Sequence, residues 1–214
     1  MHNHTHGSDA SHLALHATSP ADDPVRLAAY RRVLWLALGV NAAMFGVEVL
    51  AGLRAGSVSL LADAIDFFGD AASYAISLAV LGAAPLWRTR TALLKAASMA
   101  AFGVLVLARA AWSWAQGHTP DAATMGTIGA LALAANVGVA ALLYAHRHGD
   151  ANMRSVWLCS RNDALSNIAV LLAAAGVFGT HHAWPDLLVA TLMGSLALSS
   201  AGQVLRHARQ ELQR

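Results

Sequence analysis

The sequence predicts an all-α membrane protein, a bundle of six transmembrane helices with both termini in the cytoplasm. Three observations support this prediction. Of the 214 residues, 57% are hydrophobic and only 12% are charged, whereas about a quarter of the residues in a soluble domain are charged. Six apolar stretches approach or exceed the roughly 20 residues that a helix needs to cross the hydrocarbon core of a bilayer. The basic residues also gather at alternate connections between these stretches.

The six expected spans follow one another closely along the chain. They cover residues 33–53, 57–82, 91–114, 122–144, 155–177 and 184–205. The short connections between them leave no room for a soluble domain. We therefore divide the chain into three parts: a disordered, histidine-bearing cytoplasmic tail (1–25), a transmembrane domain (26–208) and a short C-terminal tail (209–214). No folded cytoplasmic domain is expected.

The orientation follows from the lysines and arginines, because short cytoplasmic loops carry an excess of them. Eleven of the fourteen lie before the first span, near the second or fourth connection, or after the sixth span. Arg54 and Arg109 lie toward the opposite side, and Arg161 falls inside the fifth span. The basic residues form no stripe, so we expect no nucleic-acid partner. An alanine-rich chain whose first thirty residues hold no apolar run favours a multi-pass protein of a bacterial inner membrane.

Three acidic residues lie at membrane depth in the second expected span, namely Asp63, Asp66 and Asp70. Each acid near the bilayer centre costs about 2.5–3.5 kcal/mol on insertion scales. A purely structural helix would avoid this cost with Ala or Leu. A single buried aspartate could still serve as a hydrogen-bonding contact between helices. Three within eight residues favour a functional role.

The spacing of these acids suggests their chemistry. Asp66 and Asp70 are four residues apart, which places both carboxylates on one helical face with Cβ atoms about 6 Å apart. They repel each other unless a divalent ion or a shared proton lies between them, and the two can alternate. Asp63 faces a similar direction two turns nearer the outer side. It is either a group on the exit path or an acceptor in helix packing.

A second pair with this spacing occurs in the fifth expected span, where Cys159 and Asp163 are followed one turn later by Asn167. If the two spans face each other, their two pairs supply a tetrahedral set of oxygen and sulfur ligands. Zinc and cadmium accept such a set, whereas magnesium and calcium prefer oxygen alone. Cys159 has an equally weighted alternative as a small hydrophobic residue.

Two segments resemble a known family. The stretch GSVSLLADAIDFFGD (56–70) closely resembles the second-helix signature of the cation diffusion facilitators, and NMRSVWLCSRNDALSNIAVLLAA (152–174) resembles their fifth helix. Asn41 and Glu48 in the first span and the Pro185–Asp186 step at the sixth extend the resemblance. It implies a divalent metal-ion transporter whose ion is held by two residues of each signature helix. At these positions the chain has Asp66, Asp70, Cys159 and Asp163.

The chain departs from the family pattern in two respects. Cys159 stands where histidine is most frequent, and a thiolate ligand favours softer ions such as cadmium and mercury. A thiol that does not bind would leave three carboxylates and favour harder ions. The family's usual cytoplasmic domain is also missing, so a homodimer would have to form through the transmembrane helices. We expect zinc or cadmium as the transported ion, with cobalt, nickel, manganese and mercury as further candidates.

Other polar residues receive smaller roles. Asn41 and Glu48 lie on one face of the first span, where they are accessory or pathway candidates together with Asp63 and Asn167. Glu48 is also one candidate partner for Arg161. The N-terminal tail carries a set of histidines that either captures metal loosely or is simply solvated. These histidines are His2, His4, His6, His12 and His16.

These features together predict metal efflux by metal/proton antiport through a midplane site, with protons as counter-ions and no bound cofactor. The sequence contains no metalloprotease helix motif, so we expect no enzymatic activity. The main alternative is a membrane-bound metal sensor, or a metal-binding partner that does not transport. The two differ in flux, because a sensor saturates whereas a transporter moves metal across a membrane against a proton gradient.

Overall fold

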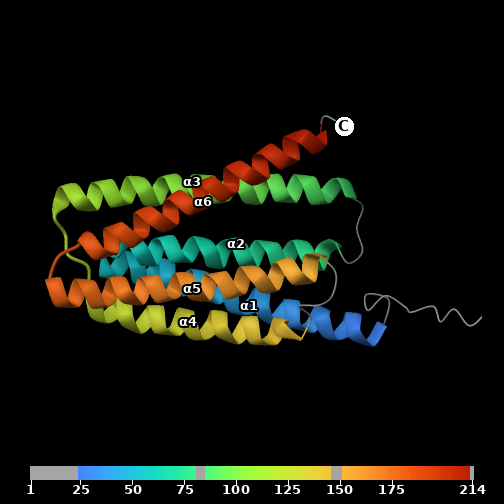
Figure 1. The fold of residues 1–214 in the computed structure, drawn as a ribbon, viewed down its shortest axis with the longest axis horizontal. Helices are drawn as coiled ribbons and strands as arrows, with labels where there is room; N and C mark the ends of the chain where they lie inside the picture. The colour runs from blue at the N-terminus through green and yellow to red at the C-terminus, as the bar shows by residue number, and fades with distance from the viewer. Residues whose placement is uncertain (1–23, 81–84, 146–150, 213–214) are drawn as a thin grey trace, which may run out of the picture.

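The computed structural model describes residues 24–80, 85–145 and 151–212, and the expected all-α architecture is confirmed there. These ranges form six α-helices (Figure 1). The helices are α1 (Pro24–Ala55), α2 (Val58–Val80), α3 (Pro85–Gln116), α4 (Ala122–Tyr144), α5 (Ala151–Thr180) and α6 (Trp184–Leu212). Helix α4 coincides with the apolar stretch that predicted it. Helices α1, α3, α5 and α6 extend several residues beyond theirs, because a helix does not have to end where its apolar run ends.

Successive helices run antiparallel, so α1 begins at the end of the bundle where α6 ends (Figure 1). The most extensive contacts join α1 with α2, α4 with α5, and α3 with α6. Helices α1, α2, α4 and α5 form a four-helix core, and the α3–α6 pair packs on it against α2 and α5. Helix α2 contacts all five other helices. This central position shelters its three aspartates from lipid.

Four of the described helices, α1, α3, α4 and α5, contain segments long and apolar enough to cross a membrane. Many of the large apolar side chains on the outside of the bundle are exposed, as expected for a surface in contact with lipid. Trp112, Trp114 and Trp184 are exposed near the end of the bundle where α3 ends and α6 begins. Tryptophans are enriched at this depth, where the hydrocarbon core meets the headgroups. The fold is therefore that of a multi-pass membrane protein.

Helices α3 and α6 approach closely where each carries a glycine. A Cβ atom on Gly103 would lie 3.1 Å from Leu198 Cγ, and one on Gly194 would lie 3.2 Å from Leu107 Cδ2. Small residues at such crossings let helix backbones come together and gain van der Waals contact. The tight α3–α6 pair thus depends on the absence of side chains at these two positions.

Candidate metal-binding site

Two of the predicted metal ligands meet across the interface between α2 and α5. The carboxyl groups of Asp70 and Asp163 lie within hydrogen-bonding reach of each other. Asp70 is 5% exposed, and Asp163 is half-buried. Asp66, one turn before Asp70, is close enough to act electrostatically on Asp163. Three acids from two helices therefore lie in one region, and their mutual repulsion favours binding of a cation or of protons.

The fourth predicted ligand, Cys159, lies in α5 one turn before Asp163, but its side chain is outside the described part of the structure. Among the described residues, no three His, Cys, Asp or Glu side chains form a set ready to hold a metal ion. In this conformation the carboxyl groups of Asp66, Asp70 and Asp163 are thus neighbours without forming a closed cage.

A tyrosine and a serine that sequence reasoning missed support the meeting of Asp70 and Asp163. The Tyr74 hydroxyl donates to Asp70 Oδ2 at 2.7 Å and lies 2.6 Å from Ser160 Oγ. The Ser160 hydroxyl also lies 3.4 Å from Asp70 Oδ2, to which it can donate directly, so Asp70, Tyr74 and Ser160 form one hydrogen-bonded cluster. Tyr74 and Ser160 are fully buried. Their spacing offers a signal, because Tyr74 follows Asp70 by four residues and Ser160 precedes Asp163 by three.

A second set of polar contacts runs from α4 through α5 to α2. Asn136 Nδ2 donates to Asn167 Oδ1 at 2.9 Å, and Asn167 Nδ2 donates to Asp63 Oδ2 at 2.5 Å. All three side chains are buried. Asp63 thus accepts a hydrogen bond between helices, and its two predicted roles, in helix packing and on the exit path, both stay predictions. Asn167, predicted as an accessory or pathway residue, joins Asn136 to Asp63.

Beyond Asp63 this set continues to α1, where Glu48 and Asp63 lie within hydrogen-bonding reach. The suggestion that Glu48 pairs with Arg161 is wrong. Arg161 is exposed on the outside of α5, donates to Asn162, and lies 5.5 Å from the centre of the Trp157 ring. A long cationic side chain facing outward can reach the interface more cheaply than it can be buried.

Asn41, the other accessory candidate of α1, is also buried. Its amide donates to the Ala37 carbonyl oxygen of its own helix at 2.8 Å. The metal-capture candidates His2, His4, His6, His12 and His16 lie outside the described residues.

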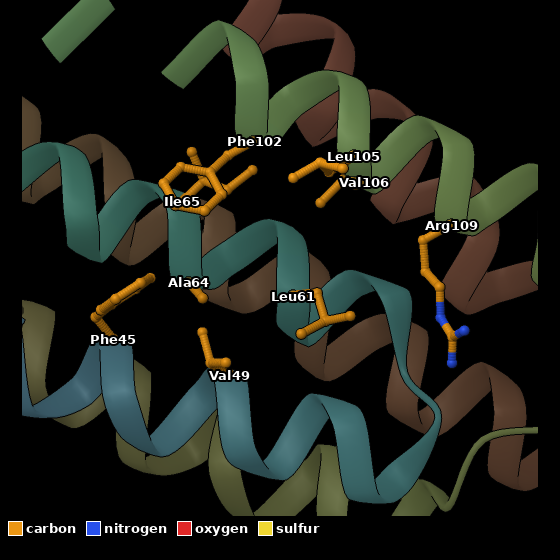
Figure 2. Close-up of a pocket in the computed structure, with 9 residues that line it drawn as sticks. All are labelled: Phe45, Val49, Leu61, Ala64, Ile65, Phe102, Leu105, Val106 and Arg109. Carbon is orange, nitrogen blue, oxygen red and sulfur yellow. The ribbon is translucent and has the colours of Figure 1, made fainter. Parts of the chain in front are cut away.

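A cavity of about 280 Å³ lies on a different side of α2, between α1, α2 and α3 (Figure 2). Among the described residues that line it, Arg109 of α3 is charged and the others have apolar side chains. Leu61 and Ile65 line it from α2 and lie roughly half a turn around the helix from Asp63. An apolar cavity whose charged group is cationic offers no ligand to a metal ion, so the candidate site is the α2–α5 interface.

Comparisons with known proteins also indicate cation transport. The family described as "Cation efflux transmembrane domain" matches residues 87–213, which is more than half of the chain. The chain is 28% identical over 222 aligned positions to the "Zinc transporter ZitB" of Escherichia coli (strain K12), covering 98% of this chain and 67% of that protein. The protein of the same name from Shigella flexneri matches with the same identity and coverage.

Proposed function

The chain belongs to the cation efflux family of multi-pass membrane transporters, and from this premise we propose that it exports zinc or cadmium from the bacterial cytoplasm in exchange for protons. One observation carries the proposal, the meeting of Asp70 and Asp163 between α2 and α5. Two acids from different helices form a site whose occupancy can alternate between protons and a divalent cation.

In the proposed site, Asp66 and Asp70 bind the ion from α2, and Cys159 and Asp163 bind it from α5. Tyr74 and Ser160 hold Asp70 in place through the hydrogen bonds described above. Metal binding at this site releases the protons held by the Asp70–Asp163 pair. Four ligands of oxygen and sulfur suit zinc and cadmium. The zinc transporters among the relatives support zinc, whereas the thiol of Cys159 supports cadmium.

Export requires this site to open alternately to each side of the membrane. Ions enter from the cytoplasm between α2 and α5, and protons from outside assist release after the bundle rocks. The central position of α2 supports this scheme, because a movement of α2 changes its contact with every other helix. We further propose that the protein forms homodimers through exposed apolar faces of its helices. The N-terminal histidines would capture metal on the cytoplasmic side.

The proposal is tested by metal flux into proteoliposomes that carry an imposed pH gradient. Zinc, cadmium, cobalt and manganese are compared for the wild type, Asp70→Asn and Asp163→Asn. We expect gradient-driven flux of zinc or cadmium in the wild type and its loss in both variants. Asp121→Asn is the matched control, because this exposed residue lies in the connection before α4. Undiminished flux in both site variants would reject the assigned site, and stoichiometric binding without flux would support the sensor instead.

A further inference from the structure

Between α1 and α2 lies a pair of acids that the metal site does not use. Glu48 and Asp63 are each 0% exposed, and their carboxyl groups are within hydrogen-bonding reach. Both Glu48 oxygens and Asp63 Oδ1 are nevertheless buried without a hydrogen-bond donor among the described residues. An ionised carboxylate can only accept hydrogen bonds, so neither carboxylate can donate a hydrogen bond to the other.

The described residues around this pair do not supply the missing hydrogen-bond donors. Asn167 donates to Asp63 Oδ2 from α5, and Asn136 of α4 has already used an amide hydrogen on Asn167. The charged groups that act on the pair are also acidic, since Asp66 acts on Glu48 and Asp163 interacts with Asp63.

The charged groups on the other helices that pack against α2 lie elsewhere. Arg109 of α3 lines the cavity on the other side of α2 (Figure 2). Asp186 of α6 is engaged at the start of α2. Repulsion between two buried carboxylates therefore has no described cation to offset it.

We propose that Glu48 and Asp63 form a proton-binding site of their own, in which one proton is shared between the two carboxyl groups. The proton turns one acid into a donor, which gives Asp63 Oδ1 and a Glu48 oxygen a common hydrogen bond and removes one of two buried charges. Among the described residues, no third acid, histidine or cysteine completes a metal-binding set with Glu48 and Asp63.

This proton site is separate from the metal site. Asp63 precedes Asp70 by seven residues, which corresponds to about 10 Å along the helix axis. It lies nearer the end of α2 that faces the outer side in the predicted orientation, and its partner acid, Glu48, comes from α1, whereas Asp163 comes from α5. The inference goes beyond the proposed function and does not depend on it, because a shared proton can be detected without any transport.

Infrared spectroscopy of the full chain in lipid nanodiscs tests the proposal. The carbonyl band of a protonated carboxylic acid is recorded at neutral pH, with and without saturating zinc or cadmium. Metal removes protons from the Asp70–Asp163 region, so the band that remains reports other protonated acids. We expect a remaining band in the wild type, its loss in the double variant Glu48→Gln/Asp63→Asn, and its retention in Asp121→Asn. Amides keep the shape of the acids and can bond to each other, and circular dichroism checks the fold.

The proposal would be overturned by the absence of a band in the metal-saturated wild type, or by a band that survives in the double variant. A band that appears only when sodium is left out would also overturn it, since the pair would then hold a sodium ion. Metal binding is measured separately by calorimetry. If no metal binds, the proposed function fails, and the metal-free difference between the wild type and the double variant still decides whether the pair holds a proton.

Discussion

Asp186, at the start of α6, caps the start of α2 through Ser59, whose backbone N–H and hydroxyl both donate to Asp186 Oδ1, at 3.0 and 2.6 Å. The Ser57 hydroxyl donates to the same oxygen at 2.7 Å, and the Val58 N–H donates to Oδ2 at 2.8 Å. The first amides of a helix lack partners within it. Here the carboxylate of Asp186, from another helix, accepts the hydrogen bonds of these amides. It thereby fixes the position of the start of α2 relative to α6.

Replacing Asp186 with alanine is therefore expected to destabilise the protein. It would leave buried donors of Ser57, Val58 and Ser59 without an acceptor, at a cost of about 3 kcal/mol or more. Asp186→Asn keeps one acceptor oxygen and should cost about half as much. Thermal unfolding in detergent, followed by circular dichroism, measures both. Equal melting temperatures for the wild type and Asp186→Ala would contradict the capping role.

Removal of the Tyr74 hydroxyl should weaken metal binding while the fold is kept. Tyr74→Phe retains the buried ring but takes one donor away from Asp70 and one hydrogen-bond partner away from Ser160. Residues that hold metal ligands in place typically contribute 10–100-fold in affinity. We expect a loss of about tenfold by calorimetry with zinc or cadmium. Thr191→Val, which removes a hydroxyl that donates to the Leu187 carbonyl oxygen of its own helix, α6, is the control. An unchanged affinity in Tyr74→Phe would separate Tyr74 from the metal site.

Asn167 should matter more to stability than Asn136, although both are buried amides. Asn167→Leu removes the contacts to Asn136 and Asp63 together, whereas Asn136→Leu removes only the contact to Asn167. Interhelical hydrogen bonds in membranes contribute about 0.6 kcal/mol each on average. The loss in Asn167→Leu should thus be about twice that in Asn136→Leu. Urea unfolding of the two variants side by side measures the ratio, and a larger effect in Asn136→Leu would refute this order.

Substitution of Cys159 should change the preferred ion if its thiolate is a ligand. Cys159→His replaces a soft sulfur with a nitrogen that zinc accepts readily, so flux should shift from cadmium toward zinc. Cys159→Ala keeps a small apolar side chain without a donor atom. If the cysteine is only a packing residue, Cys159→Ala and the wild type will transport zinc and cadmium in the same ratio.

The start of α4 should loosen in acid. Asp121 accepts hydrogen bonds from the Thr124 hydroxyl and, at 3.0 Å, from the Thr124 N–H, and these bonds lower the pKa of Asp121. A lowered pKa means that the cap is complete above the ordinary aspartate value near 3.9 and is lost as the pH falls through the lower folded value. Protection of the first-turn amides of α4 against hydrogen exchange, relative to their intrinsic exchange rates, should fall over that interval. Asp121→Asn should show no such pH dependence, and a response in the variant equal to that of the wild type would contradict the assignment.

The metal site was predictable from sequence only in part. The spacings of Asp66 with Asp70 and of Cys159 with Asp163 are local properties of a helix, so they could be recognised without a structure. Ser160 and Tyr74 are separated by 86 positions in the chain, and their contact depends on how α2 and α5 are rotated toward each other. The same holds for Glu48, whose partner on α2 was not expected.

The sequence by itself determined the membrane class, the six helices and the two pairs of candidate ligands. Hydrophobic run length and helical spacing are set within about 20 residues, and a membrane leaves helices as the only way for such runs to satisfy their backbone. Only the tertiary structure decided that α2 lies at the centre, that Asp186 caps it, and that Glu48 meets Asp63. Those relationships arise from side-chain packing between helices far apart in the chain, and no local pattern encodes the rotation of one helix against another.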